Sequence, residues 1–122
     1  MRKTFIATLS VLILPIAALA KPNDTYPVSC TVLWSAVSDT LQDAKSYGIL
    51  DMDDDAHTAT FILTGVTPKR VGSAVLIEKE NACVMRVMPA ESSAFSDDDE
   101  AAFRKHVEQS LAKVQSSSHH GL

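Results

Sequence analysis

Only two cysteines occur in the 122-residue chain, Cys30 and Cys83, and their positions limit the possible folds more than any other feature. A disulfide between them closes a loop of about 53 residues, and loss of chain entropy in the unfolded state then stabilises the fold by about 4 kcal/mol. Small domains are stable by only roughly 5–10 kcal/mol in total, so this bridge would supply a large share. It requires an oxidising compartment, and the alternative is two separate buried thiols.

The first twenty residues predict export. A basic pair, Arg2 and Lys3, precedes an apolar run, and the small-residue sequence ALA at 18–20 follows it, as in a secretory signal peptide with its cleavage site. A retained membrane anchor is the alternative, but Pro15 interrupts the run before it reaches the roughly 20 residues that span a bilayer. We therefore expect residues 1–20 to be a signal peptide and the mature protein to be periplasmic or secreted, with no membrane anchor after cleavage.

The charge balance argues against two classes of partner. The chain has 11 basic and 15 acidic residues, and cleavage that removes Arg2 and Lys3 leaves a net charge of −6. Nucleic acids and anionic lipid surfaces repel an acidic domain, so neither is an expected partner. The mature length of about 102 residues suits one domain with one core.

A helical pattern begins after a proline-containing segment. Residues 21–28 contain two prolines and predict an extended lead-in. Ser29 or Thr31 can cap a helix, and Gly48 can end it. The spacing predicts a helix over 30–46. Its apolar residues recur as on one helix face: Cys30, Trp34, Val37, Leu41 and Ala44.

Apolar residues then alternate with polar ones, which is typical of strands with one buried face. Turn-forming residues between 65 and 72 divide the pattern into two hairpins, so four antiparallel strands are the simplest interpretation. The alternating residues are Leu50 and Met52 in the first run, Ala59, Phe61 and Leu63 in the second, Val75 and Ile77 in the third, and Cys83, Met85 and Val87 in the fourth.

A second helix follows the strands. Ser96 can cap it, and four acidic residues occupy its first turn, where the helix dipole favours negative charge. The whole pattern predicts a single α+β domain over 29–115 and a disordered tail at 116–122. The expected fold is a two-layer sandwich, in which two helices cover one face of a four-stranded antiparallel sheet in the order α-β-β-β-β-α. The apolar stripe of the second helix is Phe103, Val107, Leu111 and Val114.

Loop lengths predict which strand residues face the helices. A three-residue loop at 79–81 with a left-handed last residue places Ile77 beside Cys83 on the inner side. A four-residue loop at 53–56 places Leu50 opposite Ala59, also on the inner side. Cys30 can then reach Cys83 within the core. The opposite face receives Ile49, Thr58, Thr60, Ile62, Leu76, Val84, Arg86 and Met88.

This second face is the expected working surface. A sheet face left in water usually carries polar residues, so a contiguous apolar patch indicates docking of a protein partner or self-association. The alternative is that the lead-in 21–28 or the tail folds over the patch. The predicted partner-binding residues are Ile62, Leu76, Val84, Arg86 and Met88.

The acidic stretch DMDDDAH offers an alternative function, the binding of a small ligand or cation. A calcium loop that starts at Asp51 would place Asp53 and Asp55 correctly, but Ala56 replaces the glycine of position six and Ile62 the glutamate of position twelve. Aspartates are common in turns, so a β-hairpin turn is the favoured interpretation. The weak candidates for a metal ligand are Asp51, Asp53, Asp55 and His57, and Asp54 joins them in the binding of a small ligand or cation.

No motif predicts catalysis or a cofactor. A nucleophile needs an adjacent base and an orienting group, and the chain lacks a G-x-S-x-G elbow and a glycine-rich phosphate loop. Zinc frameworks require paired spacing of ligands that is not present. Trp34 lies on the first helix's apolar stripe and is expected in the core. The sequence therefore favours a non-enzymatic binding module.

The segment VLWSAVSDTLQDAKSYGIL, with a tryptophan-bearing helix before a glycine–isoleucine pair and a strand meander, resembles small envelope domains of the BamC-type outer-membrane assembly lipoproteins. Residues 29–64 carry this likeness. The resemblance implies a binding or scaffolding module and assigns no catalytic residues. This chain lacks the lipid-attachment cysteine of those proteins, which puts membrane anchoring in doubt.

Overall fold

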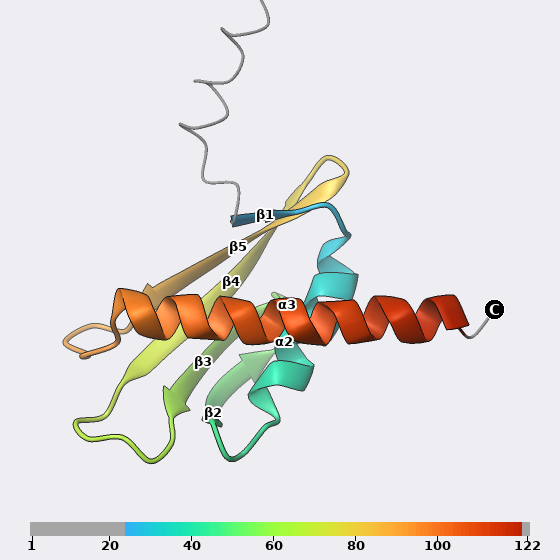
Figure 1. The fold of residues 1–122 in the computed structure, drawn as a ribbon. Helices are drawn as coiled ribbons and strands as arrows, with labels where there is room; N and C mark the ends of the chain where they lie inside the picture. Colours follow the sequence, from blue (N-terminus) through green and yellow to red (C-terminus); the bar gives the residue numbers. More distant parts are fainter. Residues whose placement is uncertain (1–23, 121–122) are drawn as a thin grey trace, which may run out of the picture.

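The computed structural model describes residues 24–120, so the expected signal peptide at 1–20 lies outside the described residues. Two helices pack on one face of a five-stranded antiparallel sheet of order β1-β5-β4-β3-β2 (Figure 1). The predicted α+β class is confirmed, but the predicted strand number is wrong because the lead-in supplies a fifth strand. The elements are β1 (Thr25–Tyr26), α2 (Cys30–Leu41), β2 (Tyr47–Asp53), β3 (Thr58–Leu63), β4 (Val71–Lys79), β5 (Ala82–Pro89) and α3 (Asp97–His120).

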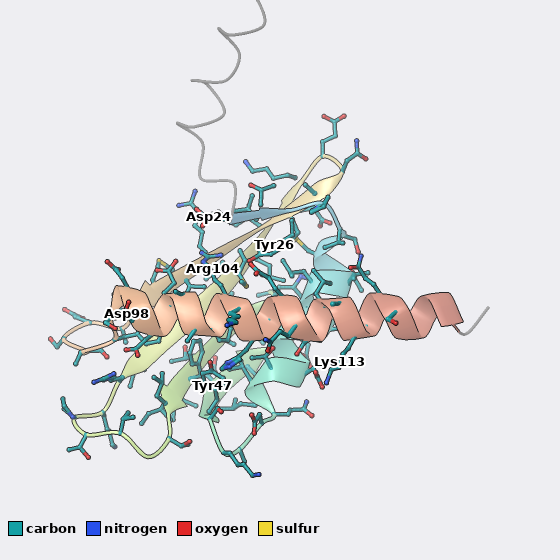
Figure 2. The ribbon with its side chains drawn as sticks, in the orientation of Figure 1. Asp24, Tyr26, Tyr47, Asp98, Arg104 and Lys113 are labelled. Atoms are coloured by element: carbon teal, nitrogen blue, oxygen red, sulfur yellow. A yellow bond between two sulfur atoms is a disulfide. The ribbon has the colours of Figure 1, made fainter. Side chains whose placement is uncertain are left out.

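The strand β1 is held at the sheet edge by a buried arginine. Tyr26 pairs with Cys83 in the β1–β5 register. Arg104 on α3 donates from Nη2 to the Met85 carbonyl at 2.9 Å and forms an ion pair with Asp24 at 3.0 Å. Figure 2 shows Arg104 on the β1 side of α3, near Asp24 and Tyr26. Residues 24–26 therefore extend the sheet at its edge instead of covering the face away from the helices.

Helix α2 starts as predicted and ends earlier. The Ser29 hydroxyl accepts a hydrogen bond from the Val32 amide and caps the helix. The helix ends at Leu41 and not at residue 46, because Asp43 organises the following turn: its carboxylate accepts from the Lys45 amide, and its carbonyl accepts from the Tyr47 amide. Gly48, expected as the helix terminator, lies inside β2.

The first hairpin is shifted from the predicted register. Asp53 pairs with Thr58, so the four-residue turn is 54–57 and not 53–56. The left-handed backbone of His57, with φ of 57°, closes this turn. A bulge between Ile49 and Asp51 inserts Leu50 as an unpaired residue. Leu50, predicted to face the core, is 58% exposed.

In the second hairpin, the side chains of β4 face the opposite way from the prediction. Lys79 pairs with Ala82, so the loop has two residues and not three, although Asn81 is left-handed as predicted, with φ of 61°. A shift of one residue moves every side chain of a strand to the other face. Leu76 therefore pairs with Met85 and is buried on the helix side, whereas Ile77 points away from it.

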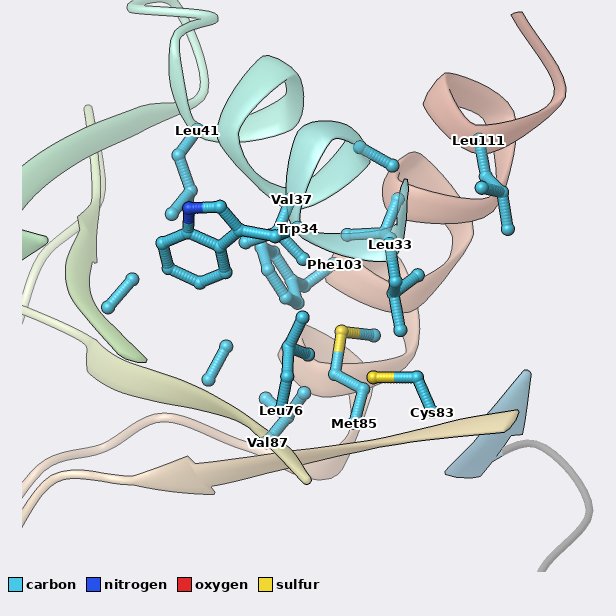
Figure 3. Close-up of a cluster of buried hydrophobic side chains, with 14 of the residues drawn as sticks. Leu33, Trp34, Val37, Leu41, Leu76, Cys83, Met85, Val87, Phe103 and Leu111 are labelled. Atoms are coloured by element: carbon cyan, nitrogen blue, oxygen red, sulfur yellow. The ribbon is translucent and has the colours of Figure 1, made fainter. Parts of the chain in front are cut away.

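The core lies between the helices and the inner face of the sheet (Figure 3). Phe103 of α3 stacks on Phe61 of β3 with ring centroids 4.6 Å apart. The predicted disulfide is confirmed: Cys30 and Cys83 are bonded, with Cα atoms 5.0 Å apart, so the first turn of α2 is covalently attached to β5. Figure 3 shows further side chains of α2 above strand residues; those labelled include Leu33, Trp34, Val37, Leu41, Leu76, Met85 and Val87.

Helix α3 is capped as predicted and is longer than predicted. The Ser96 hydroxyl accepts from the Asp99 amide while the Asp99 carboxylate accepts from the Ser96 amide, which satisfies two backbone donors at the helix start. The helix continues to His120, over residues 116–120 of the segment expected as a disordered tail, and 121–122 lie outside the described part. Between residues 24 and 120, no helix has the length and hydropathy to cross a bilayer.

Candidate functional site

The face of the sheet that points away from both helices is the main candidate surface. Inner residues such as Ala74 and Met85 are fully buried under the helices, and strand alternation turns their neighbours outward. None of the described segments packs as a layer over these neighbours. We call this surface the outer face and define it by its apolar side chains and one arginine: Ile62, Val71, Val75, Ile77, Val84, Met88 and Arg86.

Four of the five predicted partner-binding residues lie on the outer face. These are Ile62, Val84, Arg86 and Met88. Leu76 does not, because the two-residue hairpin loop turns it into the core, where it is 6% exposed. The structure therefore removes Leu76 from the candidate surface.

Three residues of the outer face were not predicted from the sequence to lie on it. Val71, Val75 and Ile77 occupy outward positions of β4, the central strand of the face, and the polar Ser73 lies between Val71 and Val75. They are half-buried, since β-branched neighbours on the same face shield one another, whereas Met88 at the rim is 42% exposed. The left-handed propensity of Asn81 was the relevant signal, but it fits both a two-residue and a three-residue loop.

Polar and charged side chains border the apolar centre. Thr58 and Thr60 of β3 lie beside Asp53 and Asp51 of β2, while Arg86 lies across β4 from them on β5. Basic and acidic groups thus occupy opposite sides of the same face.

The acidic turn packs on Trp34 and does not form a metal cage. Asp53 Oδ1 accepts hydrogen bonds from the amides of Asp55 and Ala56, at 3.0 and 2.9 Å, which is the backbone capping expected of a turn aspartate. Asp54 Oδ1 accepts from Trp34 Nε1 at 2.9 Å. Across residues 24–116, whose side chains the structure describes, no group of three or more His, Cys, Asp or Glu side chains is arranged to hold a metal ion. Of the candidate ligands, Asp53 and Asp54 thus have turn-stabilising roles.

Trp34 has the core position that its place on the helical stripe predicted. It is 7% exposed, and its ring stacks on His57 with centroids 5.2 Å apart. The left-handed His57 backbone brings the imidazole over the indole. His57, a weak metal candidate, is therefore occupied in an aromatic contact.

A further candidate site is a polar groove between α2 and α3, with a volume of about 490 Å³. At its base Tyr47 Oη and His106 Nδ1 are 2.9 Å apart, and the hydroxyls of Thr40 and Ser110 are 3.1 Å apart. Burial, with smaller effects of Asp43 and Asp99, raises the pKa of Tyr47 to about 12. The phenol is thus protonated at neutral pH. The Thr40–Ser110 pair joins α2 to α3 and the Tyr47–His106 pair joins β2 to α3, so these polar groups satisfy one another between elements, which is a structural role.

The disulfide gives evidence about the cellular compartment in which the protein is found. Both cysteines are joined, and no free thiol exists in the chain. Such bridges persist in oxidising environments, so the bond is consistent with a non-cytoplasmic protein.

Comparison with models of protein families gives no match to this chain. Comparison with curated proteins likewise gives none. Among solved structures, the crystal structure of Ara h 8.0201 aligns with 73% of this chain and 93% of its own length, with a TM-score of 0.47 and 15% sequence identity. A likeness at this level transfers no function.

Proposed function

We propose that this protein is an exported, non-enzymatic binding or scaffolding module, periplasmic or secreted, that docks on a protein partner through its outer face. The signal-like residues 1–20 and the Cys30–Cys83 disulfide support export. The likeness of residues 29–64 to BamC-type envelope domains implies the same class of function.

The observation that carries the proposal is the uncovered apolar centre of the outer face. Val71, Val75 and Ile77 on β4 are flanked by Ile62 on β3 and Val84 on β5. A sheet face that remains in water usually alternates to polar residues, and a contiguous apolar patch marks an interaction site. The alternative, in which the lead-in covers this face, does not occur in residues 24–28, because β1 pairs edge to edge with β5.

A photo-cross-linking amino acid at position 88 tests the proposal in cells that produce the protein. Met88 is at the rim of the outer face and 42% exposed, so a larger side chain fits there without disturbing the core. The matched control is the same amino acid at Lys105, an exposed position on α3. Retention of the disulfide in both variants verifies the fold.

The proposal predicts a covalent adduct of one defined mass from position 88 and none from position 105. The mass of that adduct reports whether the partner is a second copy or another protein. Absence of an adduct at position 88, or the same adducts from both positions, contradicts docking through the outer face.

A further inference from the structure

We infer that the outer face binds a second copy of this chain, face to face, around a two-fold axis that runs parallel to the strands between β3 and β4. The inference rests on the proposed function and specifies the partner. It follows from the way in which charged and apolar residues are ordered across the four long strands.

One row of residues runs across the outer face from a positive to a negative side chain. In the strand register, Arg86 pairs with Val75, Val75 with Thr58, and Thr58 with Asp53. The row therefore crosses β5, β4, β3 and β2 in order. Three strand spacings separate its charged ends, a distance of about 14 Å.

Arg86 and Asp51 have no side-chain partner among the described residues, whereas Asp53 uses one carboxylate oxygen, Oδ1, to cap the turn. Arg86 is exposed, and neither a hydrogen bond nor an ion pair connects it to any described residue. The Asp51 carboxylate, on the acidic side of the face, is likewise without such a contact. Opposite charges on the same face are thus too far apart to pair within one molecule and are free to pair between two.

A two-fold axis along the strands brings these charges together. The rotation exchanges the two sides of the face, so that β5 of one copy lies over β2 of the other and β4 lies over β3. Arg86 of each copy then lies opposite Asp53 of its partner. Sheets that pack in this aligned way are about 10 Å apart with strands within about 30° of each other, which an arginine and an aspartate can bridge together.

The same rotation buries apolar residues against each other. Val71 pairs with Ile62 in the register, on the two strands next to the axis. Each Val71 therefore lies over Ile62 of the other copy, and Val75 lies over Thr58. The row between these two pairs is more polar: Met88 pairs with Ser73, Ser73 with Thr60 and Thr60 with Asp51, so each Met88 lies opposite Asp51 of the other copy. A rotation axis perpendicular to the strands, in contrast, superimposes β5 on β5 and brings like charges to the same edge.

Charge-reversal variants test the inference with the full, oxidised chain by sedimentation velocity. Arg86→Glu places Glu opposite Asp53 twice in each dimer, and Asp53→Lys places Lys opposite Arg86 twice. Each variant alone should raise the dimer dissociation constant at least about tenfold, because like charges that face each other in an interface are repulsive. An equimolar mixture of the two restores both pairs and should again form a dimer. Lys105→Glu on α3 makes the same change of charge away from the face and should leave the dimer unchanged.

Asp53 also caps the turn, so Asp51→Lys replaces Asp53→Lys if the latter does not retain its disulfide and its cooperative unfolding. Even a weak dimer, with a dissociation constant on the order of 100 μM, is detectable at that protein concentration. The inference is overturned if the wild-type protein is monomeric there, or if it forms a dimer that Arg86→Glu does not weaken. A position-88 adduct with a different protein together with a monomeric wild type overturns the second-copy inference and retains the proposed docking function. Absence of any adduct at position 88 removes the docking function itself.

Discussion

Trp34 of α2 and Asp54 of the β2–β3 turn are joined by a hydrogen bond from the indole Nε1–H to Oδ1, 2.9 Å long. The same indole stacks on His57. One buried side chain of the helix therefore holds a turn that lies twenty residues farther along the chain. Two of the four aspartates in this stretch thus have structural roles, since Asp54 receives the indole donor and Asp53 caps the backbone.

Asp54→Ala should lower the free energy of unfolding by about 1 kcal/mol, because the partly buried Trp34 Nε1–H loses its acceptor. Asp55→Ala is the matched control, since the Asp55 side chain accepts no hydrogen bond from the described residues. Urea unfolding gives the energies, and tryptophan fluorescence reports the changed indole environment. Equal effects of the two substitutions would show that the indole bond does not stabilise the turn.

Removal of the disulfide should lower the free energy of unfolding more than the loss of any other single contact. Replacement of Cys30 and Cys83 together by alanine opens a loop of 53 residues. The unfolded chain gains entropy, and the free energy of unfolding should fall by about 4 kcal/mol. Guanidinium unfolding of the oxidised, the reduced and the doubly substituted protein measures it. Unchanged stability on reduction contradicts the prediction.

Gly72→Ala should destabilise the fold through a clash with Phe95. A Cβ on Gly72 would lie 2.7 Å from Cε2 of the buried Phe95 ring. Overpacking of this kind costs roughly 1–3 kcal/mol. Thermal unfolding measures the loss, with Ser73→Ala on the other face of β4 as the control.

A second substitution distinguishes this clash from a general loss of chain flexibility. Phe95→Leu removes ring atoms next to position 72, so the combination with Gly72→Ala should cost less than the sum of the two single changes. Strict additivity would assign the effect of Gly72→Ala to another cause.

Alkaline pH should destabilise the protein through its two tyrosines. Burial is the main cause that raises the pKa of both Tyr26 and Tyr47 from 10.0 to about 12. Between these values the unfolded chain releases phenolic protons that the folded protein retains, so the free energy of unfolding falls as pH rises from about 10 to about 12. Urea unfolding at a series of pH values measures this slope.

Tyr47→Phe provides the control for the alkaline effect. The variant has one shifted phenol fewer, so its stability should depend less steeply on pH over the same interval. Tyrosinate absorbance of the folded wild-type protein should rise at higher pH than that of the unfolded chain. Coincident titration curves would contradict the raised pKa values.

Periodicity and capping predicted the helices and the long strands because these signals are local. Ser29 and Ser96 cap their helices as expected. The helix ends were less predictable: the turn at Asp43 stops α2 before its apolar spacing ends, and α3 continues into polar residues. The pairing of Cys30 with Cys83 followed from their being the only two cysteines in a chain expected to be exported, and placing both on inner positions was consistent with it.

The outer face was predicted only in part because hairpin register depends on loop length, which the sequence left open. Asn81 adopts the expected left-handed conformation, yet the loop has two residues. That difference of one residue exchanges Leu76 for Val75 and Ile77 on the outer face. The bulge at Leu50 was likewise not predictable, since an unpaired residue leaves no signal in a pattern of alternating apolar residues.

Cys83 is attached to the N-terminal part of the chain twice, by the strand pair with Tyr26 and by the covalent bond to Cys30. A pulling force on the N-terminus therefore first meets non-covalent contacts, which are the two-residue strand pair and the ion pair of Asp24 with Arg104. It then meets the disulfide, which does not break without reduction. Mechanical unravelling from this end stops at Cys30, where the load passes through the disulfide to β5.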